Sequence, residues 1–276
     1  MPTETTEAAD AALFLFAHPD DEFGVWQTML DCMARGLRVR CAYFTTSATA
    51  SLSARRAAES RRVLGALGVA PDDIVFPGAE LAILDASLPH RLAPAAAWLA
   101  QWCRQAGTPR LLCVPAWEGG HQDHDALHAL AVETAHAAGL LACVRQYALY
   151  HSAGLPPPLF RVLRPLAANG AVERTRIPWR NRLRFCRYCV AYPSQLMTWI
   201  GLFPCVLWHY LRRGEQTLQA VSIARTLERP HAGALYYEQR KFFTWPQMQQ
   251  LLASWRASRP GDVERRDHPP APRPPR

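Results

Sequence analysis

The stretch that decides the fold is "LFLFAHPDDEF", residues 13–23. An apolar run leads to Ala17, and a histidine, a proline and three adjacent acids follow without a break. Near-continuous apolar runs are typical of strands that are buried on both faces of a parallel sheet. Three neighbouring carboxylates repel one another, and their burial is costly unless a positive partner lies among them. The stretch therefore predicts a buried strand that ends at a charged site.

The first 155 residues continue this pattern. Further strand-like apolar runs lie at 38–46, 73–78, 110–117 and 144–152, and helix-like stretches at 21–35, 51–68, 89–106 and 124–138 alternate with them. This alternation predicts an α/β fold with a Rossmann-like, mostly parallel sheet and helices on both faces. Ligands of such sheets bind beyond the carboxyl ends of the strands. "HPDDE" and "EGGHQDHD" each follow a predicted strand, so we expect them to meet at that edge.

The predicted domain organisation is a tail over 1–12, one domain over 13–258 and a disordered, Pro/Arg-rich tail over 259–276. Within the domain, a catalytic core covers about 13–155 and a C-terminal α/β extension covers about 156–258. No Asp, Glu, Lys or Arg occurs over 188–211. A buried helix pair is the favoured interpretation of this stretch, and an interfacial helix in peripheral contact with a membrane is the alternative.

The bulk composition indicates a globular, cytoplasmic protein. The eight cysteines lack the dense spacing of a secreted disulfide scaffold, and the acidic N-terminus lacks the basic start of a signal peptide. Residues 1–155 carry 11 basic and 16 acidic side chains, whereas residues 156–276 carry 20 and 7. The basic half suits phosphates, anionic lipid or nucleic acid. No nucleic-acid partner is expected, because the basic residues are scattered and form no binding motif.

The two charged clusters have the composition of a catalytic metal site. His18 and Asp21 are three residues apart at a strand-to-helix junction, and His124 opens a later helix. Two imidazoles and one carboxylate leave a position open for water, as catalytic zinc requires. Asp20 is then free to accept a proton from the attacking water, and His121 to donate one or to stabilise an oxyanion. The same ligands suit ferrous iron, so Zn²⁺ or Fe²⁺ is predicted.

"AHPDDE" with the downstream "HQDH" resembles the PIG-L/LmbE-like family of metal-dependent de-N-acetylases, the N-acetylglucosaminyl deacetylase family. "RRAAESRRVLGALGV" is similar to that family's Arg-x-x-Glu segment, and "YCVAYPSQ" is a weaker match to its late Ser-Gln segment. The resemblance is strong over about 11–150 and weak afterwards. This sequence departs from the family in "TTSATASLSARR", which has no glycine after the second strand. We expect Gly119 and Gly120 to supply flexibility before His121 instead.

The resemblance implies a role for each matching residue. It makes His18, Asp21 and His124 the metal ligands. It makes Asp20 the general base and His121 the electrophilic or acid partner.

Three further residues follow from the resemblance. Asp123 would orient a histidine, and Glu22 would support the start of the helix rather than act in catalysis. Arg56 would hold a hydroxyl or phosphate of the substrate, and its alternative role is an ion pair with Glu59 or a solvated helix face.

A strand-like run at Tyr236 and Tyr237 would line a sugar pocket or form an edge strand.

The predicted function is hydrolytic removal of an N-acetyl group from an amino sugar, such as N-acetylglucosamine, free or linked to a phosphate or lipid. One alternative is a metal-dependent amidase that cleaves a larger amino-sugar or thiol conjugate. Another is a non-catalytic protein that binds a sugar or anionic lipid. The presence of an acid suited to act as base argues against a pure binder, which has no need of Asp20.

Overall fold

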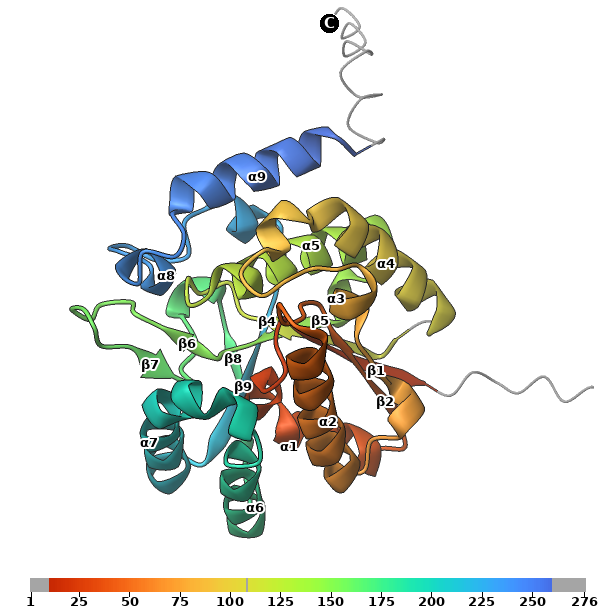
Figure 1. The fold of residues 1–276 in the computed structure, drawn as a ribbon, viewed down its shortest axis with the longest axis vertical. Coiled ribbons are helices and arrows are strands. Elements are labelled where there is room, and N and C mark those ends of the chain that lie inside the picture. The colour runs from red at the N-terminus through yellow and green to blue at the C-terminus, as the bar shows by residue number, and fades with distance from the viewer. Residues whose placement is uncertain (1–9, 108, 260–276) are drawn as a thin grey trace, which may run out of the picture.

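The computed structural model describes residues 10–107 and 109–259, so the predicted tails fall almost entirely outside it. A seven-stranded sheet in the order β3-β2-β1-β4-β5-β9-β8 forms its centre (Figure 1). The pairings along the sheet from β3 to β5 are parallel. β9 pairs antiparallel with β5, and β8 pairs antiparallel with β9. The strands are β1 Ala11–Phe16, β2 Arg38–Tyr43, β3 Ile74–Val75, β4 Leu111–Pro115, β5 Val144–Tyr147, β6 Tyr150–His151, β7 Arg161–Val162, β8 Val172–Arg176 and β9 Glu215–Ala220.

Helices cover both faces of the sheet, as the sequence predicted. Alternate residues of β1 enter two separate cores, Leu13 and Leu15 on one face, Phe14 and Phe16 on the other. The first core is packed by α4, α5 and α9, and the second by α1, α2, α6 and α7. The helices are α1 Trp26–Ala34, α2 Ala50–Leu67, α3 Pro77–Glu80, α4 Leu92–Gln105, α5 Gln122–Ala137, α6 Trp179–Cys189, α7 Leu196–Arg212, α8 Tyr236–Gln239 and α9 Trp245–Ala257.

Several predicted boundaries are corrected. β1 begins at Ala11, inside the predicted tail, because its first residues pair with β2. The predicted helix over 21–35 is split at Val25 into the 3-10 helix η1 (Asp21–Gly24) and α1. The run at Tyr236 is the short helix α8 and not an edge strand, since the Glu238 side chain accepts from the backbone N–H of Leu235 and starts a helical turn.

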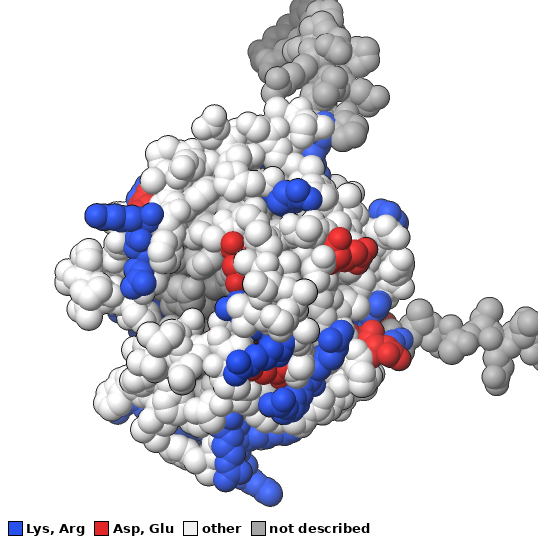
Figure 2. All heavy atoms as spheres, in the orientation of Figure 1, with Lys and Arg blue, Asp and Glu red and all other residues white. Residues whose placement is uncertain are grey.

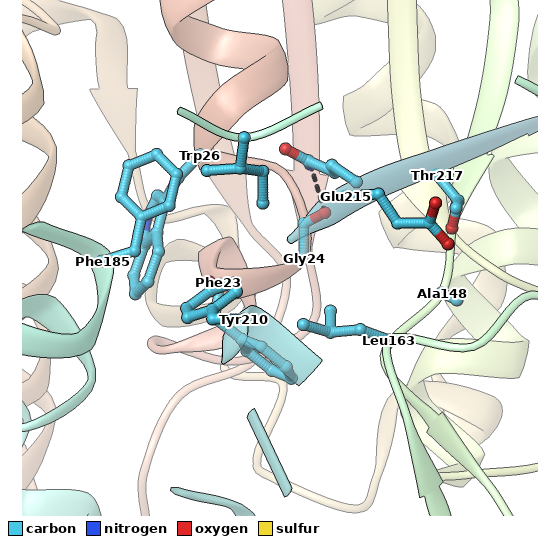
Figure 3. Close-up of a pocket in the computed structure, with 11 residues that line it drawn as sticks. Phe23, Gly24, Trp26, Ala148, Leu163, Phe185, Tyr210, Glu215 and Thr217 are labelled. Carbon is cyan, nitrogen blue, oxygen red and sulfur yellow. Dashed lines mark hydrogen bonds between the residues drawn. The ribbon is translucent and has the colours of Figure 1, made fainter. Parts of the chain in front are cut away.

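The C-terminal extension clamps the segment that follows β1. Gln216 in β9 donates from its amide to the carbonyl of Gly24, the dashed line in Figure 3. Its side-chain oxygen accepts from the backbone N–H groups of Gln27 and Thr28. A Cβ at Gly24 would lie 2.6 Å from Tyr147, so only glycine fits here. The small pocket beside these groups measures about 10 Å³, room for about one water. It is a packing defect behind η1 rather than a ligand site.

The apolar stretch 188–211 lies in the helix pair α6 and α7, but this pair is not buried as predicted. One side of α7 packs into the core through Trp199, Leu202 and Val206. The other side is open, with Met197 82% and Trp208 66% exposed. Among the described residues no single helix is long and apolar enough to cross a bilayer, and only the pair taken together, bent by 68°, passes that test.

Candidate active site

The two charged clusters meet at one edge of the sheet. β1 and β4 are parallel neighbours, so the segments that follow them emerge side by side. His18 and η1 follow β1, and the loop to α5 follows β4. His121 is the N-cap of α5, so His124 lies in the first turn of that helix. This topology explains how residues more than 100 positions apart come into contact.

Two ring nitrogens and the two oxygens of one carboxylate face one point. His18 Nδ1 lies 3.2 Å from His124 Nε2. His124 Nε2 lies 3.1 Å from Asp21 Oδ1, and His18 Nδ1 lies 3.5 Å from Asp21 Oδ2. Two imidazole nitrogens and one carboxylate thus form a triangle with nearly equal edges.

This triangle fits a small divalent cation. Ligand atoms about 2.0–2.1 Å from a tetrahedral metal are about 3.3–3.4 Å apart, close to the three observed separations. If both facing ring nitrogens carry lone pairs, they cannot form a hydrogen bond with each other. A cation between them would bind both lone pairs. Nitrogen and carboxylate ligands suit either zinc or ferrous iron.

A second group of possible ligands, His18, His121 and Asp123, overlaps the first. Its atoms already have other partners. His121 Nδ1 accepts from the backbone N–H of Asp123 at 3.2 Å. The Asp123 carboxylate accepts from the backbone N–H groups of Ala86 and Leu88, at 2.6 and 3.0 Å. The triangle of His18, Asp21 and His124 is therefore the better metal site.

Asp123 orients His18 rather than His124. Its Oδ2 accepts from His18 Nε2 at 3.0 Å, and its side chain is fully buried. With the proton held on Nε2, the lone pair of His18 Nδ1 faces Asp21 and His124. A carboxylate on the far nitrogen of a metal-binding histidine fixes the tautomer and raises ligand basicity.

The electrostatics of the triangle favour positive charge. Burial would raise the pKa of Asp21, but His124 and His18 lower that pKa well below its ordinary value. Burial would lower the pKa of His18, but hydrogen bonds to Asp123 and Asp21 raise it well above its ordinary value. The carboxylates keep their negative charge and draw positive charge onto His18, which is the environment that a cation would enter.

Asp20 is buried beside the triangle in a strained conformation. Its φ is 106°, in the left-handed region that non-glycine residues rarely adopt. The Glu22 carboxylate holds this turn, because it accepts from the backbone N–H of Asp20 at 2.8 Å and from the Tyr43 hydroxyl. Burial, Asp21 and Glu22 together raise the pKa of Asp20 well above its ordinary value. Glu22 supports the backbone and does not line the cavity.

His121 is held as a neutral donor. Burial and the neighbouring His18 lower the pKa of His121 to about 3. Because its Nδ1 accepts from the backbone N–H of Asp123, the remaining proton lies on Nε2. The side chain is 22% exposed and lines the same cavity as Asp20. Such an N–H is suited to stabilise a developing oxyanion.

Arg56 lines this cavity too. The two alternatives to a substrate contact, an ion pair with Glu59 and a solvated helix face, are both wrong. The Arg56 guanidinium pairs with Asp85, and it is Arg55 that reaches Glu59, at 3.3 Å. Asp85 also accepts from the Thr45 hydroxyl at 2.9 Å, so the pair is held at the cavity wall. Asp85 was missed in the sequence, where the only signal for it was its position after an apolar run.

Gly119 and Gly120 are buried and tightly packed, so the prediction of flexibility is wrong. Gly119 has a φ of +69°, and a Cβ at Gly120 would overlap the carbonyl oxygen of Tyr150. The two glycines permit a close backbone approach that fixes the position of His121.

The cavity over the triangle measures about 190 Å³ and adjoins a cleft of about 640 Å³. His121, Tyr150, Thr198 and Leu202 line both. The cleft also has aromatic walls, from Phe160, Tyr236, Tyr237 and Phe242. Tyr236 and Tyr237 thus line a cleft beside the site, and their contact with a sugar stays a prediction.

The weak "YPSQ" resemblance points to residues at this cavity. Gln195 lines it and donates to the Pro19 carbonyl at 3.0 Å. Ser194 donates to the Glu59 carboxylate. Tyr150 was missed, because a tyrosine at the end of a strand gives no signal of its own.

Comparison with known proteins is consistent with this geometry. The family model described as PIG-L, GlcNAc-PI de-N-acetylase, matches residues 13–135. No curated protein matches the chain in sequence.

Solved structures share the fold. A deacetylase from the teicoplanin biosynthesis pathway is 16% identical, with a TM-score of 0.59, and the alignment covers 77% of this chain and 98% of that one. A zinc-inhibited form of teicoplanin deacetylase is 15% identical, with a TM-score of 0.56 and the same coverage. N,N'-diacetylchitobiose deacetylase from Pyrococcus horikoshii is 16% identical, with a TM-score of 0.56 and coverage of 81% and 88%.

At these identities the solved structures indicate fold alone, whereas the family match rests on sequence. Residues 13–135 contain "HPDDE" and "HQDH", and with them every atom of the triangle. Over these residues the chain is similar to the PIG-L family, and the match spans less than half of the chain.

Proposed function

We propose that the protein is a metal-dependent hydrolase that removes the N-acetyl group from an N-acetylated amino sugar, free or as part of a conjugate. The observation that carries this proposal is the triangle of His18 Nδ1, His124 Nε2 and Asp21, with separations of 3.1–3.5 Å. The family match and the deacetylases that share the fold support the reaction class. The size of the aromatic cleft supports a substrate larger than a single amide group.

His18, Asp21 and His124 would hold Zn²⁺ or Fe²⁺. A cation bound there would make water more acidic and polarise the amide carbonyl. That charge would also lower the pKa of the adjacent Asp20, which burial and its acidic neighbours raise when no cation is present. Both metals are proposed, since the three ligands suit either one and a teicoplanin deacetylase of this fold has a zinc-inhibited form.

The chain's own residues would then divide the proton transfers. Asp20 accepts a proton from the attacking water, and the Nε2 proton of His121 stabilises the oxyanion that develops on the amide. The proton that Asp20 accepted then passes to the nitrogen, which leaves as the free amine as the C–N bond breaks, and acetate is the second product. Arg56, held by Asp85, would bind a hydroxyl or phosphate of the sugar.

The test measures acetate released from N-acetylglucosamine and from its phosphate- and lipid-linked forms. We expect Asp20→Asn to lower kcat by about 10²- to 10⁴-fold, the range for loss of a general base. Its bound metal should stay at the wild-type level. Asp72→Asn is the matched control, because Asp72 is exposed and outside the cavity. Full activity of Asp20→Asn with metal bound would disprove the base assignment.

A further inference from the structure

The outward side of α7 is apolar along its whole length. Met197, Ile200, Trp208 and Leu211 are 54–82% exposed, and their spacing of three, eight and three residues places them along one side of the helix. No charged residue interrupts α7 before Arg212. Since the inward side is apolar as well, this helix is apolar all round, a pattern that belongs to buried or membrane-contacting helices.

α6, which packs beside α7, has an exposed apolar side of its own. Trp179, Leu183 and Val190 are 54%, 63% and 66% exposed and are spaced by four and seven residues. Together, α6 and α7 with their connection carry eight of the twelve exposed large apolar side chains in the described part of the chain. Isolated exposed apolar residues are ordinary, but a concentration of this kind marks an interaction surface. We call it the α6–α7 face.

The α6–α7 face has only one sign of charge. No Asp or Glu occurs from Arg174 to Gly214, whereas exposed arginines lie at 180, 187, 212 and 213. In Figure 2 the part of the surface over α7 is mainly white. Tryptophan and leucine flanked by arginine are the composition of helices that lie in the interface of an anionic membrane.

We propose that the α6–α7 face docks the protein on the surface of an anionic lipid bilayer. The helices would lie in the headgroup region and not cross the bilayer, because their inner sides pack into the protein core. A second copy of the chain is a poorer occupant, since it would bring two arginine-bearing surfaces together without opposing acids.

This docking would place the candidate active site at the membrane surface. Met197, Thr198 and Gly201 at the start of α7 line the aromatic cleft that also contains His121. The mouth of the cleft therefore borders the α6–α7 face. The proposal does not depend on the proposed reaction, because docking is measured as binding.

The test is co-sedimentation of the full chain with vesicles of phosphatidylcholine alone or of phosphatidylcholine mixed with phosphatidylglycerol. We expect binding to the mixed vesicles that weakens with salt, and little binding to the neutral ones. The double variant Ile200→Glu, Trp208→Glu should bind at least about tenfold more weakly, since it removes two apolar anchors. Leu227→Glu is the matched control, because Leu227 is 58% exposed but lies outside the face.

A second pair of variants guards against unfolding of the first. Arg180→Gln and Arg187→Gln should each weaken binding about fivefold, the value of one basic residue near an anionic surface. Circular dichroism checks that every variant is folded. Three results would overturn the proposal: no binding to either vesicle, undiminished binding of the folded double variant, or a dimer in sedimentation velocity that the double variant converts to monomer.

Discussion

Two groups of buried acids meet at the start of α5, and the pKa values of the two groups shift in opposite directions. Asp123 lies with Asp21 among histidines, and the pKa of each is lowered. Asp125 lies beside Glu118, and both accept from backbone N–H groups, with no histidine among these donors. Burial raises the pKa of Asp125 to about 7 and that of Glu118 to about 8.

The difference shows that burial of acids alone does not make a cation site. Backbone N–H groups pair with only one oxygen of Asp125 and one of Glu118, and they do not offset the cost of burying the charge. Histidines do so for Asp21 and Asp123, and His18 Nδ1 and His124 Nε2 face the metal position. We therefore expect the metal affinity to depend on Asp21 and Asp123 and to be independent of Asp125 and Glu118.

The largest effect is expected for His124→Ala. The wild type should retain about one zinc or iron per chain, the stoichiometry of a single three-ligand site. The variant should lose most of this metal and all measurable acetate release, because one corner of the triangle is gone. Mass spectrometry of the purified protein measures the metal. His136→Ala is the control, since His136 lies near the exposed end of the same helix. Metal retained by His124→Ala would exclude the triangle as its site.

An intermediate effect is expected for Asp123→Asn. An amide has one acceptor oxygen, whereas Asp123 accepts from His18, Ala86 and Leu88. We expect a 10- to 100-fold loss of metal affinity, about the usual effect of removing a carboxylate that orients a ligand.

Asp125→Asn gives the matched comparison. Oδ1 of Asp125 accepts both backbone bonds, from Glu118 and Gly119, and an asparagine keeps that oxygen. Metal affinity should stay at the wild-type level, as measured by competition with a chromogenic chelator. Equal losses in both variants would mean that the two groups do not differ as described.

The smallest effect is expected for Glu118→Gln, on stability alone. The folded-state pKa of about 8 is above the ordinary 4.5, so Glu118 contributes its full stability below pH 4.5 and loses it as pH rises toward 8. The glutamine keeps the acceptor for Leu149 and Tyr150 and does not titrate. Between pH 5 and 7 the variant should therefore gain stability relative to the wild type by up to about 1.4 kcal/mol per pH unit.

Urea unfolding at several pH values checks this expectation. Glu173→Gln is the control, because the Glu173 side chain is 61% exposed. Its stability should follow the wild type across the range. Parallel curves for wild type and Glu118→Gln would show that Glu118 is ionised in the folded protein at all these pH values.

The sheet and both histidine clusters could be predicted because one rule connects them. Parallel strands place their carboxyl ends at one edge, so "HPDDE" and "HQDH" had to be neighbours if their strands were. Asp85 and Tyr150 escaped because nothing in the local sequence distinguishes a side chain at a cavity wall from one in solvent. The conformations of Gly119 and Gly120 escaped for a related reason, since a close approach to Tyr150 is a tertiary contact.

The second half resisted prediction because its elements depend on distant partners. β8 follows β6 and β7 without an α-helix between them, β9 follows α6 and α7, and β9 pairs antiparallel with both β5 and β8. The apolar run of α7 predicted burial, but hydrophobicity does not say which side of a helix is covered. That distinction needed the packing of Trp199, Leu202 and Val206 against the core.

The loop that anchors Asp123 has a consequence for how this protein can change over evolution. It holds the carboxylate through the backbone N–H groups of Ala86 and Leu88, and no side chain of the loop takes part in those two bonds. Mutations at the loop's exposed positions can therefore reshape the entrance to the cavity while the support for His18 persists. The loop's Asp85 sets the position of Arg56, so a single substitution there could redirect substrate preference and leave the metal site intact.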